Sequence, residues 1–351
     1  MMPIHQESTL NTSTLRVGID IGGTFTDFVV YNSETGGIQR FKLLSSPHDP
    51  ADTVLKGLER IFGSTEKEKR PAEIIHGSTV ATNALLERKG AVTAFIATKG
   101  FRDILQIGRQ NRPELYNFFF TPAEPLTPAE LRFEIDERVD SQGNVLIPLD
   151  QQRLALLTPA LKKLGVESVA ICFLFSFLHP AHEQFLAQEL RSAGFFVSAS
   201  SEILPEYREF ERASTTAVNA YVSPVLDRYL QHLETALPET QHLRVMQSNG
   251  GNISIHEARS NGVRCILSGP AGGVIGARLT GSWAYQTLSE LTALTPNLAE
   301  RMRLITFDMG GTSTDVSLID GEPQTTTDAS ISGYPIRIPI LDIPTIGAGG
   351  G

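Results

Sequence analysis

Apolar and polar positions follow two different periods along this chain. The runs AVTAFIATKG at 91–100 and ESVAICFLFSF at 167–177 are apolar almost throughout, which predicts buried strands. The segment 50–63 instead carries an apolar stripe at helical spacing, made of Val54, Leu55, Leu58, Ile61 and Phe62. Strands that alternate with helices in this way predict an α/β fold.

The same periods predict several further elements. Helices are expected at 78–90, 151–165, 209–237 and 267–281. The third of these is expected to break around Ser223 and Pro224, because a residue before proline avoids the helical conformation. A strand is expected at 243–252, running into a glycine-rich turn, and a hairpin turn with its return strand at 141–150.

One eight-residue pattern occurs twice. Residues 20–27 read DIGGTFTD and residues 308–315 read DMGGTSTD, and the two agree at six positions. Each copy follows one apolar run and leads into another. Strand, Gly-Gly turn and strand is the spacing of a β-hairpin, so the sequence predicts two hairpins of the same kind.

These turns carry the chemistry of a phosphate-binding site. Paired glycines permit a tight turn and let backbone N–H groups approach an anion, and threonines add hydroxyl donors. Asp20 and Asp308, at the strand ends, could hold a divalent cation or its waters. The candidate cofactor-binding residues are Gly22, Gly23, Thr24 and Thr26 in the first copy and Gly310, Gly311, Thr312 and Thr314 in the second.

A single turn of this kind is more often a plain hairpin than a phosphate site. The second copy changes the balance, because hairpin stability does not require the same aspartates and threonines again. Neither copy is a Walker A loop, since no Gly-Lys-Ser/Thr follows, and neither opens a helix as a dinucleotide fingerprint does. Two such hairpins facing one another would hold a polyphosphate from both sides, so we expect ATP as the ligand.

Composition narrows the class of protein. The net charge of −9 argues against nucleic acid as the main partner, because phosphate backbones require a basic surface. The cysteines Cys172 and Cys265 lack metal-ligand spacing and fit a reducing compartment, and Cys172, within an apolar run, is expected to be a core residue. No secretory signal is visible, and the longest apolar run, 168–178, is too short to span a bilayer. These observations predict a soluble cytoplasmic protein without a membrane partner.

Longer blocks resemble the hydantoinase A/5-oxoprolinase family, within the superfamily of actin, sugar kinases and heat-shock chaperone ATPases. The blocks that carry the resemblance are VGIDIGGTFTDFVV (17–30), HGSTVATNALLERKGA (76–91), TKGFRDILQIGRQNRPELY (98–116), REFERASTTAVNAYV (208–222), VMQSNGGN (245–252), LSGPAGGVIGA (267–277), FDMGGTSTDVSL (307–318) and LDIPTIGAGGG (341–351). They occur in the family's order and cover nearly everything from residue 16 to the end.

The resemblance implies an actin-like ATPase (RNase H-like) architecture. A disordered tail is expected at 1–14, the N-terminal domain with the first hairpin at 15–200, and part of the second domain at 201–351. ATP and Mg²⁺ are implied as cofactors, with Asp20 and Asp308 as catalytic residues that organise Mg²⁺. The resemblance also implies nucleotide-binding residues in the GAGGG block, namely Gly347, Gly349 and Gly350.

The implied activity is ATP-dependent opening of a cyclic amide, 5-oxoproline or a hydantoin, through phosphorylation of the ring carbonyl. A hydantoinase B-type subunit or domain would complete the hydrolysis, and a homo-oligomer is compatible with this scheme. An ATP-dependent ketone carboxylase subunit is the first alternative, since the same hairpins would serve it. Family members continue past the GAGGG block whereas this sequence stops at Gly351, so an incomplete nucleotide site in an inactive, partner-binding fragment is the second alternative.

Several other polar residues have two interpretations each. His76, at a strand-to-helix junction, is a candidate catalytic residue for proton transfer, or a histidine bonded to nearby backbone. Thr79 and Asn83 lie one helical turn apart and could line one cleft, although helix capping explains Thr79 equally well. Asp27 and Asp315 could be catalytic, or could stabilise the hairpins through Asx-type bonds.

Three small groups complete the candidates. A polar cluster that could orient a carboxylate, or form a solvated loop, consists of Arg109, Asn111 and Arg112. Residues expected to form ion pairs on a helix surface are Glu209, Glu211 and Arg212. Glycines expected to permit close helix packing are Gly269, Gly272 and Gly273.

Overall fold

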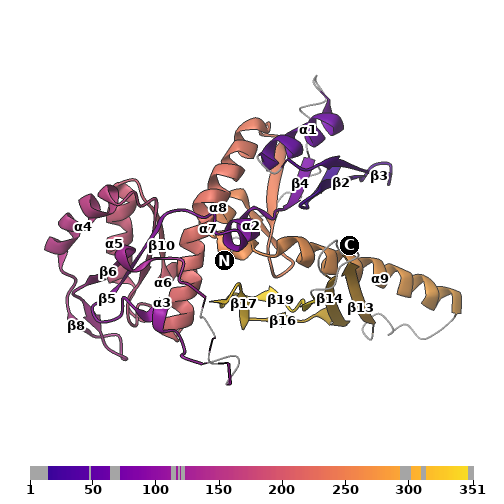
Figure 1. Ribbon diagram of the computed structural model, residues 1–351. Helices are drawn as coiled ribbons and strands as arrows, with labels where there is room; N and C mark the ends of the chain where they lie inside the picture. The colour runs from indigo at the N-terminus through magenta and orange to yellow at the C-terminus, as the bar shows by residue number, and fades with distance from the viewer. Residues whose placement is uncertain are drawn as a thin grey trace, which may run out of the picture.

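The computed structural model describes residues 15–46, 49–63, 72–111, 116–117, 119, 123–292, 302–309 and 314–346. Figure 1 shows the long helix α7 (Glu209–Ala236) between two sheet-containing parts, and the helix α9 (Ser268–Thr292) beside a third. Parallel and antiparallel strands combined with helices confirm the predicted α/β class.

The largest sheet has the strand order β12-β11-β4-β1-β2-β3. In it β1, β4 and β11 run parallel, whereas β2, β3 and β12 run antiparallel to their neighbours. Side chains of β1 alternate strictly between buried and exposed, so one face of the strand packs into the core. The bounds are β1 (Leu15–Ile21), β2 (Phe25–Asn32), β3 (Ile38–Leu44), β4 (Ala72–Gly77), β11 (Gln241–Met246) and β12 (Asn252–Ser254). Because β11 and β12 follow residue 200, this sheet takes strands from both expected domains, and the domain boundary stays a prediction.

A second sheet, with the order β10-β9-β5-β6, is parallel throughout. Every residue of β5 (Thr93–Thr98) and β9 (Ser168–Cys172) is buried, as expected of strands covered on both faces. The other elements of this part are β6 (Arg132–Ile135), β7 (Arg138–Val139), β8 (Val145–Ile147), β10 (Phe196–Ala199), α3 (Ile104–Ile107), α4 (Gln151–Lys163), α5 (Ala181–Ser192) and α6 (Ser200–Ile203). The β7–β8 pair confirms the hairpin predicted near 141–150.

The third sheet contains the second of the two predicted hairpins. Ile319 on its inner face is fully buried against Ala271 and Val274 of α9. Its strands are β13 (Arg303–Met309), β14 (Thr314–Asp320), β15 (Glu322–Pro323) and β20 (Thr345–Ile346). Two short pairs follow, β16 (Thr325–Thr326) with β19 (Ile340–Leu341) and β17 (Ala329–Ile331) with β18 (Tyr334–Ile336).

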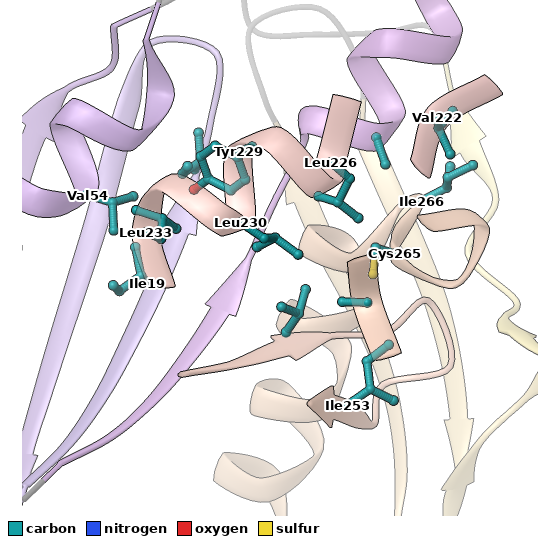
Figure 2. Close-up of a cluster of buried hydrophobic side chains, with 14 of the residues drawn as sticks. Ile19, Val54, Val222, Leu226, Tyr229, Leu230, Leu233, Ile253, Cys265 and Ile266 are labelled. Atoms are coloured by element: carbon teal, nitrogen blue, oxygen red, sulfur yellow. The ribbon is translucent and has the colours of Figure 1, made fainter. Parts of the chain in front are cut away.

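The main core lies where α7 crosses the largest sheet. Figure 2 shows Leu226, Leu230 and Leu233 of α7 pointing toward Ile19 of β1, Val54 of α1 and Cys265. The three leucines are fully buried and recur at spacings of four and three, which is the period of one helix face. The remaining helices around this core are α1 (Pro50–Phe62), α2 (Val80–Leu86) and α8 (Ile255–Ser260).

The predicted break in the long helix is wrong, because α7 continues through Pro224 as one element of 28 residues. A proline inside a helix removes one hydrogen bond and costs about 3 kcal/mol. Here Ser223 and Pro224 are buried, and the Ser223 hydroxyl accepts a hydrogen bond from the N–H of Gly262 at 3.0 Å. Packing along both flanks of α7 therefore outweighs the local preference.

The apolar run at 167–177 is also wrong as a single strand, because β9 ends at Cys172. Beyond it the Phe173 N–H donates to Glu183 Oε1 at 2.7 Å, and the Leu174 N–H donates to Thr98 Oγ1 at 2.9 Å. The N–H groups of Phe173 and Leu174 therefore bond to side chains, and are not available to pair with a neighbouring strand. The helix predicted at 78–90 is likewise shorter, at Val80–Leu86, and the one at 267–281 is longer, at Ser268–Thr292.

Gly57→Ala is expected to lower the free energy of unfolding by about 1–3 kcal/mol, because it overpacks the core. A β-carbon on Gly57 in α1 would lie 2.0 Å from the ring of Phe28, which is fully buried and stacks on Phe41. The matched control is Gly276→Ala in α9, where an added β-carbon would meet none of the described residues within 4 Å and alanine should stabilise the helix by up to about 1 kcal/mol. Urea unfolding measures both, and a stabilising effect of Gly57→Ala would contradict the packing argument.

Candidate phosphate-binding site

Both predicted hairpins are present, and their registers are the same. In the first, Asp20 pairs with Asp27 and Ile21 with Thr26. In the second, Asp308 pairs with Asp315 and Met309 with Thr314. Since the positions of the shared pattern coincide, each hairpin places its first aspartate at the strand end, one residue pair before the turn.

The Asp20 carboxylate lies against two glycines from distant elements. A β-carbon on Gly77, at the end of β4, would lie 3.1 Å from Asp20 Oδ1, and one on Gly269, in the first turn of α9, 3.3 Å from the same atom. Ser78 and Ser268 join these two elements, since the Ser78 N–H donates to Ser268 Oγ at 3.4 Å and that hydroxyl donates to the Ser78 carbonyl at 3.3 Å. Gly269 thus permits the predicted close approach of the helix.

Negative charge gathers at this point. The pKa of Asp20 is raised above its ordinary value, first by the surrounding protein and then by the charges of Asp27 and Asp308. The side chain still reaches solvent, but enough protein surrounds the carboxylate to disfavour its charged form. In the described part of the chain no lysine or arginine forms an ion pair with Asp20. Because the charge of Asp308 raises the pKa of Asp20, these two aspartates, one from each hairpin, lie close enough to interact electrostatically.

Ser45, which the sequence did not single out, ties the first turn in place. Its hydroxyl donates to the Gly22 carbonyl at 2.8 Å, and its N–H donates to the Thr24 carbonyl at 2.9 Å. The same hydroxyl lies 3.0 Å from Thr26 Oγ1. These bonds join residues 19 to 23 positions apart, so no local pattern could have indicated them.

The threonines and second aspartates of the hairpins have different surroundings. Thr24 is exposed at the turn, whereas Thr26 and Thr314 lie on buried faces. Asp27 lies 3.5 Å from Lys42 Nζ of β3, and Asp315 accepts a hydrogen bond from Thr345 Oγ1 of β20 at 2.7 Å. Asp27 and Asp315 thus join each hairpin to its neighbouring strand, a structural role made through these contacts and not through Asx-type bonds in the described part of the chain. The catalytic interpretation of Asp27 and Asp315 stays a prediction.

Gly22 and Gly23 are in the described part, and the Gly22 N–H donates to the Phe25 carbonyl at 2.9 Å. Several candidates lie outside the described residues, namely Gly310, Gly311, Thr312, Gly347, Gly349, Gly350 and Arg112. Their assignment as binding residues stays a prediction.

His76 lies in β4 beneath the site and is completely buried. Its Nε2 is 2.6 Å from the hydroxyl of Tyr229 on α7, and its Nδ1 makes no hydrogen bond of ordinary geometry within the described residues. Burial lowers the pKa of His76 to about 4, and the neighbouring Ile19 backbone offsets only part of this. A general base works best with a pKa near the operating pH. The catalytic assignment of His76 stays a prediction, and the geometry favours a structural role.

The burial of His76 predicts a loss of stability in acid. Because the folded chain holds this ring neutral to about pH 4 while an unfolded histidine binds a proton near 6.5, the unfolded state takes up the proton first. Stability should be constant above pH 6.5 and fall by about 3 kcal/mol as the pH drops to 4. His76→Gln should lack this component of the loss. Urea unfolding at three pH values measures it, and equal losses in both proteins would refute the assignment.

The remaining candidates on helices are Thr79 and Asn83 at the start of α2 and Gly272 and Gly273 in α9. Thr79 caps α2 without a side-chain hydrogen bond to the helix backbone, and Asn83 Nδ2 lies 3.5 Å from Thr79 Oγ1. A β-carbon on Gly272 would lie 3.4 Å from the Met246 side chain, which agrees with close packing of α9. One on Gly273 would meet none of the described residues within 4 Å, so within that part of the chain the packing expectation is wrong there.

Arg109, of the predicted polar cluster, forms an ion pair with Glu211, of the segment REFER at 208–212. Arg109 donates from Nε to Glu211 Oε1 at 2.8 Å and from its terminal nitrogen to Oε2 at 2.7 Å. Asn111 is exposed beside this pair, and Glu209 is exposed at the start of α7. Arg212, by contrast, is only 1% exposed, so its expected surface ion pair is wrong. Its side chain turns inward because Ser176, Ser200 and the Phe173 carbonyl accept its hydrogen bonds.

The cysteines are structural. Both are buried and unpaired, and burial raises the pKa of Cys172 to about 11 and that of Cys265 to about 12. A thiol with such a pKa is not a nucleophile near neutral pH. The expectation of Cys172 as a core residue agrees with this environment.

Comparison with known proteins identifies the family. Residues 16–194 match the model of the hydantoinase/oxoprolinase N-terminal region, and residues 212–351 match that of hydantoinase/oxoprolinase. The chain belongs to the hydantoinase/oxoprolinase family. The resemblance noted from the sequence blocks is thereby confirmed.

Curated relatives of this hydantoinase/oxoprolinase chain are longer than it is. Caprolactamase subunit alpha from Pseudomonas jessenii is 36% identical over 351 residues, covering 96% of this chain and 48% of that protein. 5-oxoprolinase 1 from Arabidopsis thaliana is 37% identical over 377 residues, covering 98% of this chain and 28% of that protein. The chain therefore spans about half or less of the length of these relatives.

Solved structures confirm the fold of this hydantoinase/oxoprolinase chain. The ATP-dependent caprolactamase from Pseudomonas jessenii has a TM-score of 0.79 at 34% identity, and nucleotide-free acetone carboxylase a TM-score of 0.78 at 27% identity. Each covers 96% of this chain and 48% of the solved one. The expected actin-like ATPase fold is thereby confirmed. In the part of the chain that the structure describes, no helix is long and apolar enough to cross a membrane.

Proposed function

We propose that this chain binds ATP and Mg²⁺ between its two hairpins and uses them to activate the carbonyl of a cyclic amide for ring opening. One observation supports the proposal most directly. The two hairpins, which lie far apart in the sequence and have the same register, bring Asp308 close enough to Asp20 for its charge to raise the pKa of Asp20. Two carboxylates that approach one another destabilise the folded chain, since like charges repel. A cation bound between the two carboxylates offsets that repulsion, which explains their position.

The first hairpin and α9 support phosphate binding. Gly-Gly turns let backbone N–H groups approach an anion, and the N-terminus of a helix carries a partial positive charge. The first turn of α9 lies at Asp20 through Gly269, so the helix N-terminus and the first hairpin face the same space. We assign the phosphates to this space, with Gly22, Gly23 and Thr24 on one side.

The residues present fit Mg²⁺. The described part of the chain has no group of three or more acidic, histidine or cysteine side chains in ligating geometry. Mg²⁺ is usually held by one or two carboxylates together with waters and substrate phosphates, and Asp20 and Asp308, which interact electrostatically, provide two carboxylates. When bound, the ion neutralises charge on the phosphates during transfer.

The chemistry that follows is phosphoryl transfer to a poor electrophile. The ring carbonyl oxygen forms a bond to the γ-phosphorus as the bond to ADP breaks. Water then adds to the activated carbon, the ring C–N bond breaks, and the nitrogen takes the proton. The acyl phosphate that remains is hydrolysed by a second water to the carboxylate and phosphate. The protein acts chiefly by positioning and charge stabilisation.

We further propose that a hydantoinase B-type subunit or domain carries out the hydrolytic steps. The name of the relative caprolactamase subunit alpha supports a division between subunits, and the chain spans 48% of that protein. A soluble, cytoplasmic location and a homo-oligomer remain our expectations for the assembled enzyme.

The test is ADP formation that depends on the ring. The chain, alone and co-expressed with a B-type partner, is incubated with ATP and Mg²⁺ and with 5-oxoproline, hydantoin or ε-caprolactam. Ring-dependent ADP release and a ring-opened product by mass spectrometry are expected. Release only with acetone and bicarbonate would favour a ketone carboxylase, the second candidate, which the structural similarity to acetone carboxylase supports.

A further inference from the structure

The same face of the two hairpins has opposite surroundings. When the repeated patterns are aligned at Asp20 and Asp308, three apolar positions on one face correspond, namely Val17 with Ile305, Ile19 with Phe307, and Val30 with Leu318. In the first hairpin these side chains are 1%, 3% and 7% exposed, whereas in the second they are 73%, 64% and 54% exposed. The second hairpin therefore leaves in water a face that the first hairpin buries.

Two helices cover this face of the first hairpin. Helix α1 lies on β2, since a β-carbon on Gly57 would lie 2.0 Å from the ring of Phe28. Helix α7 adds Leu230 and Leu233 to the same core, and Figure 2 shows Leu233 beside Ile19 of β1. The edge of β1 that does not face β2 is paired with the parallel strand β4. The first hairpin thus has both a helix layer and a parallel neighbouring strand.

We call the corresponding surface of the second hairpin its outer face. It consists of Ile305, Phe307, Met309, Val316 and Leu318, which lie on one side of β13 and β14. The opposite side is covered by α9, as Figure 1 shows and as the burial of Ile319 against this helix confirms. Within the described residues β13 pairs with β14 alone, so its other edge presents backbone N–H and C=O groups to no neighbouring strand.

The outer face has the composition of a protein-binding surface. All five of its side chains are apolar, and at its border Arg303 Nε and Asp320 Oδ1 lie 3.3 Å apart and neutralise one another. An apolar centre with a polar rim is the usual anatomy of a protein interface, and exposed apolar patches mark such interfaces. A partner for the outer face therefore presents apolar side chains to it.

The length of the relatives indicates the source of this partner. The chain covers 48% of caprolactamase subunit alpha from Pseudomonas jessenii, so about half of that protein lies outside the matched region. The outer face lacks a helix layer, and β13 lacks one neighbouring strand. A polypeptide of that length has room to supply both.

We propose that the outer face and the open edge of β13 bind an amphipathic helix and a strand of the polypeptide that corresponds to the uncovered part of caprolactamase subunit alpha. The strand runs parallel to β13, as β4 does to β1, and the helix buries the outer face, as α1 buries Phe28. Neither contact depends on the cyclic-amide chemistry of the proposed function.

The test co-expresses the chain with that uncovered part of the Pseudomonas jessenii protein, and sedimentation of the purified mixture over a dilution series gives the dissociation constant. An equimolar complex is expected. Ile305→Lys and Leu318→Lys replace side chains that lie directly opposite one another on the two strands. Each should weaken the complex by at least about tenfold, because the lost burial of one such side chain is sufficient for that.

Ile38→Lys is the matched control. Ile38, on β3, is 68% exposed and lies outside the outer face, so its change should leave the dissociation constant unaltered. Circular dichroism melting of each isolated variant separates lost docking from lost folding. Since Ile305 and Leu318 are exposed in the isolated chain, lysine at either position should change its melting temperature little.

Absence of a complex, or a complex that tolerates both Ile305→Lys and Leu318→Lys, would overturn the proposal. Two other occupants of the outer face would overturn it as well. A homodimer of the isolated chain that Ile305→Lys dissociates would assign the face to a second copy. Binding of a hydantoinase B-type subunit that the same variant abolishes would assign the face to that partner.

Discussion

Asp20→Asn is expected to abolish the thermal stabilisation of the chain by ATP and Mg²⁺, while raising the melting temperature of the nucleotide-free chain. At a ligand concentration of 100 times the dissociation constant, binding stabilises a folded protein by about 2.7 kcal/mol, and this is the quantity that the variant should lose. Asparagine keeps the shape of the side chain but not the charge that Mg²⁺ requires. Asp308→Asn should lose the nucleotide effect in the same way.

The rise in the nucleotide-free melting temperature follows from the sign of the pKa shift. Asp20 has a pKa raised above 3.8 when folded, so at neutral pH its ionised form is less favourable in the folded chain than in the unfolded one. Removing the charge removes this penalty, and the advantage of the variant should vanish as the pH falls below 3.8. Differential scanning fluorimetry across pH, with and without ATP, measures both effects.

Asp52→Asn is a suitable control, because Asp52 pairs with Lys56 on an exposed helix face at 2.7 Å. Exposed pairs contribute about 0–1 kcal/mol, so neither the nucleotide shift nor the melting temperature should change much. An Asp20→Asn chain that still responds fully to ATP would exclude the proposed metal role.

Arg212→Ala is expected to lower the free energy of unfolding by about 3–5 kcal/mol, the usual effect of removing one side of a buried charge arrangement. Arg212 Nη1 donates to Ser200 Oγ at 2.9 Å, and that hydroxyl donates to Glu183 Oε1 at 2.7 Å. Glu183 is fully buried and also accepts the N–H groups of Phe173 and Ser201, both at 2.7 Å. Alanine would leave this carboxylate without a cation and the Phe173 carbonyl without its donor.

Urea unfolding tests this expectation, with Arg228→Ala as the matched control. Arg228 lies on the same helix and pairs with Glu167 at 3.3 Å on the surface, so its loss should cost less than about 1 kcal/mol. Combining Arg212→Ala with Glu183→Gln should recover part of the stability, because the two positions act on one network. Equal small effects of Arg212→Ala and Arg228→Ala would show that the buried network contributes little.

The sequence predicted best what depends on neighbouring residues. Both hairpins, with their aspartates in the same register, followed from the repeated pattern alone, because turn residues and flanking apolar runs decide a hairpin locally. The order of family blocks then indicated the fold. The errors came where distant contacts outweigh local preference, as at Pro224, which packing holds inside one helix, and at Phe173, whose N–H is taken by Glu183.

Tertiary structure alone decided the surroundings of the candidate residues. The sequence could not show that Asp20 lies against Gly77 and Gly269, because these residues belong to a different strand and a different helix. It could not distinguish a buried Arg212 from an exposed Arg109, since both are arginines in polar segments. Burial and charge depend on which remote groups fill the space around a side chain, and only the folded chain brings those groups together.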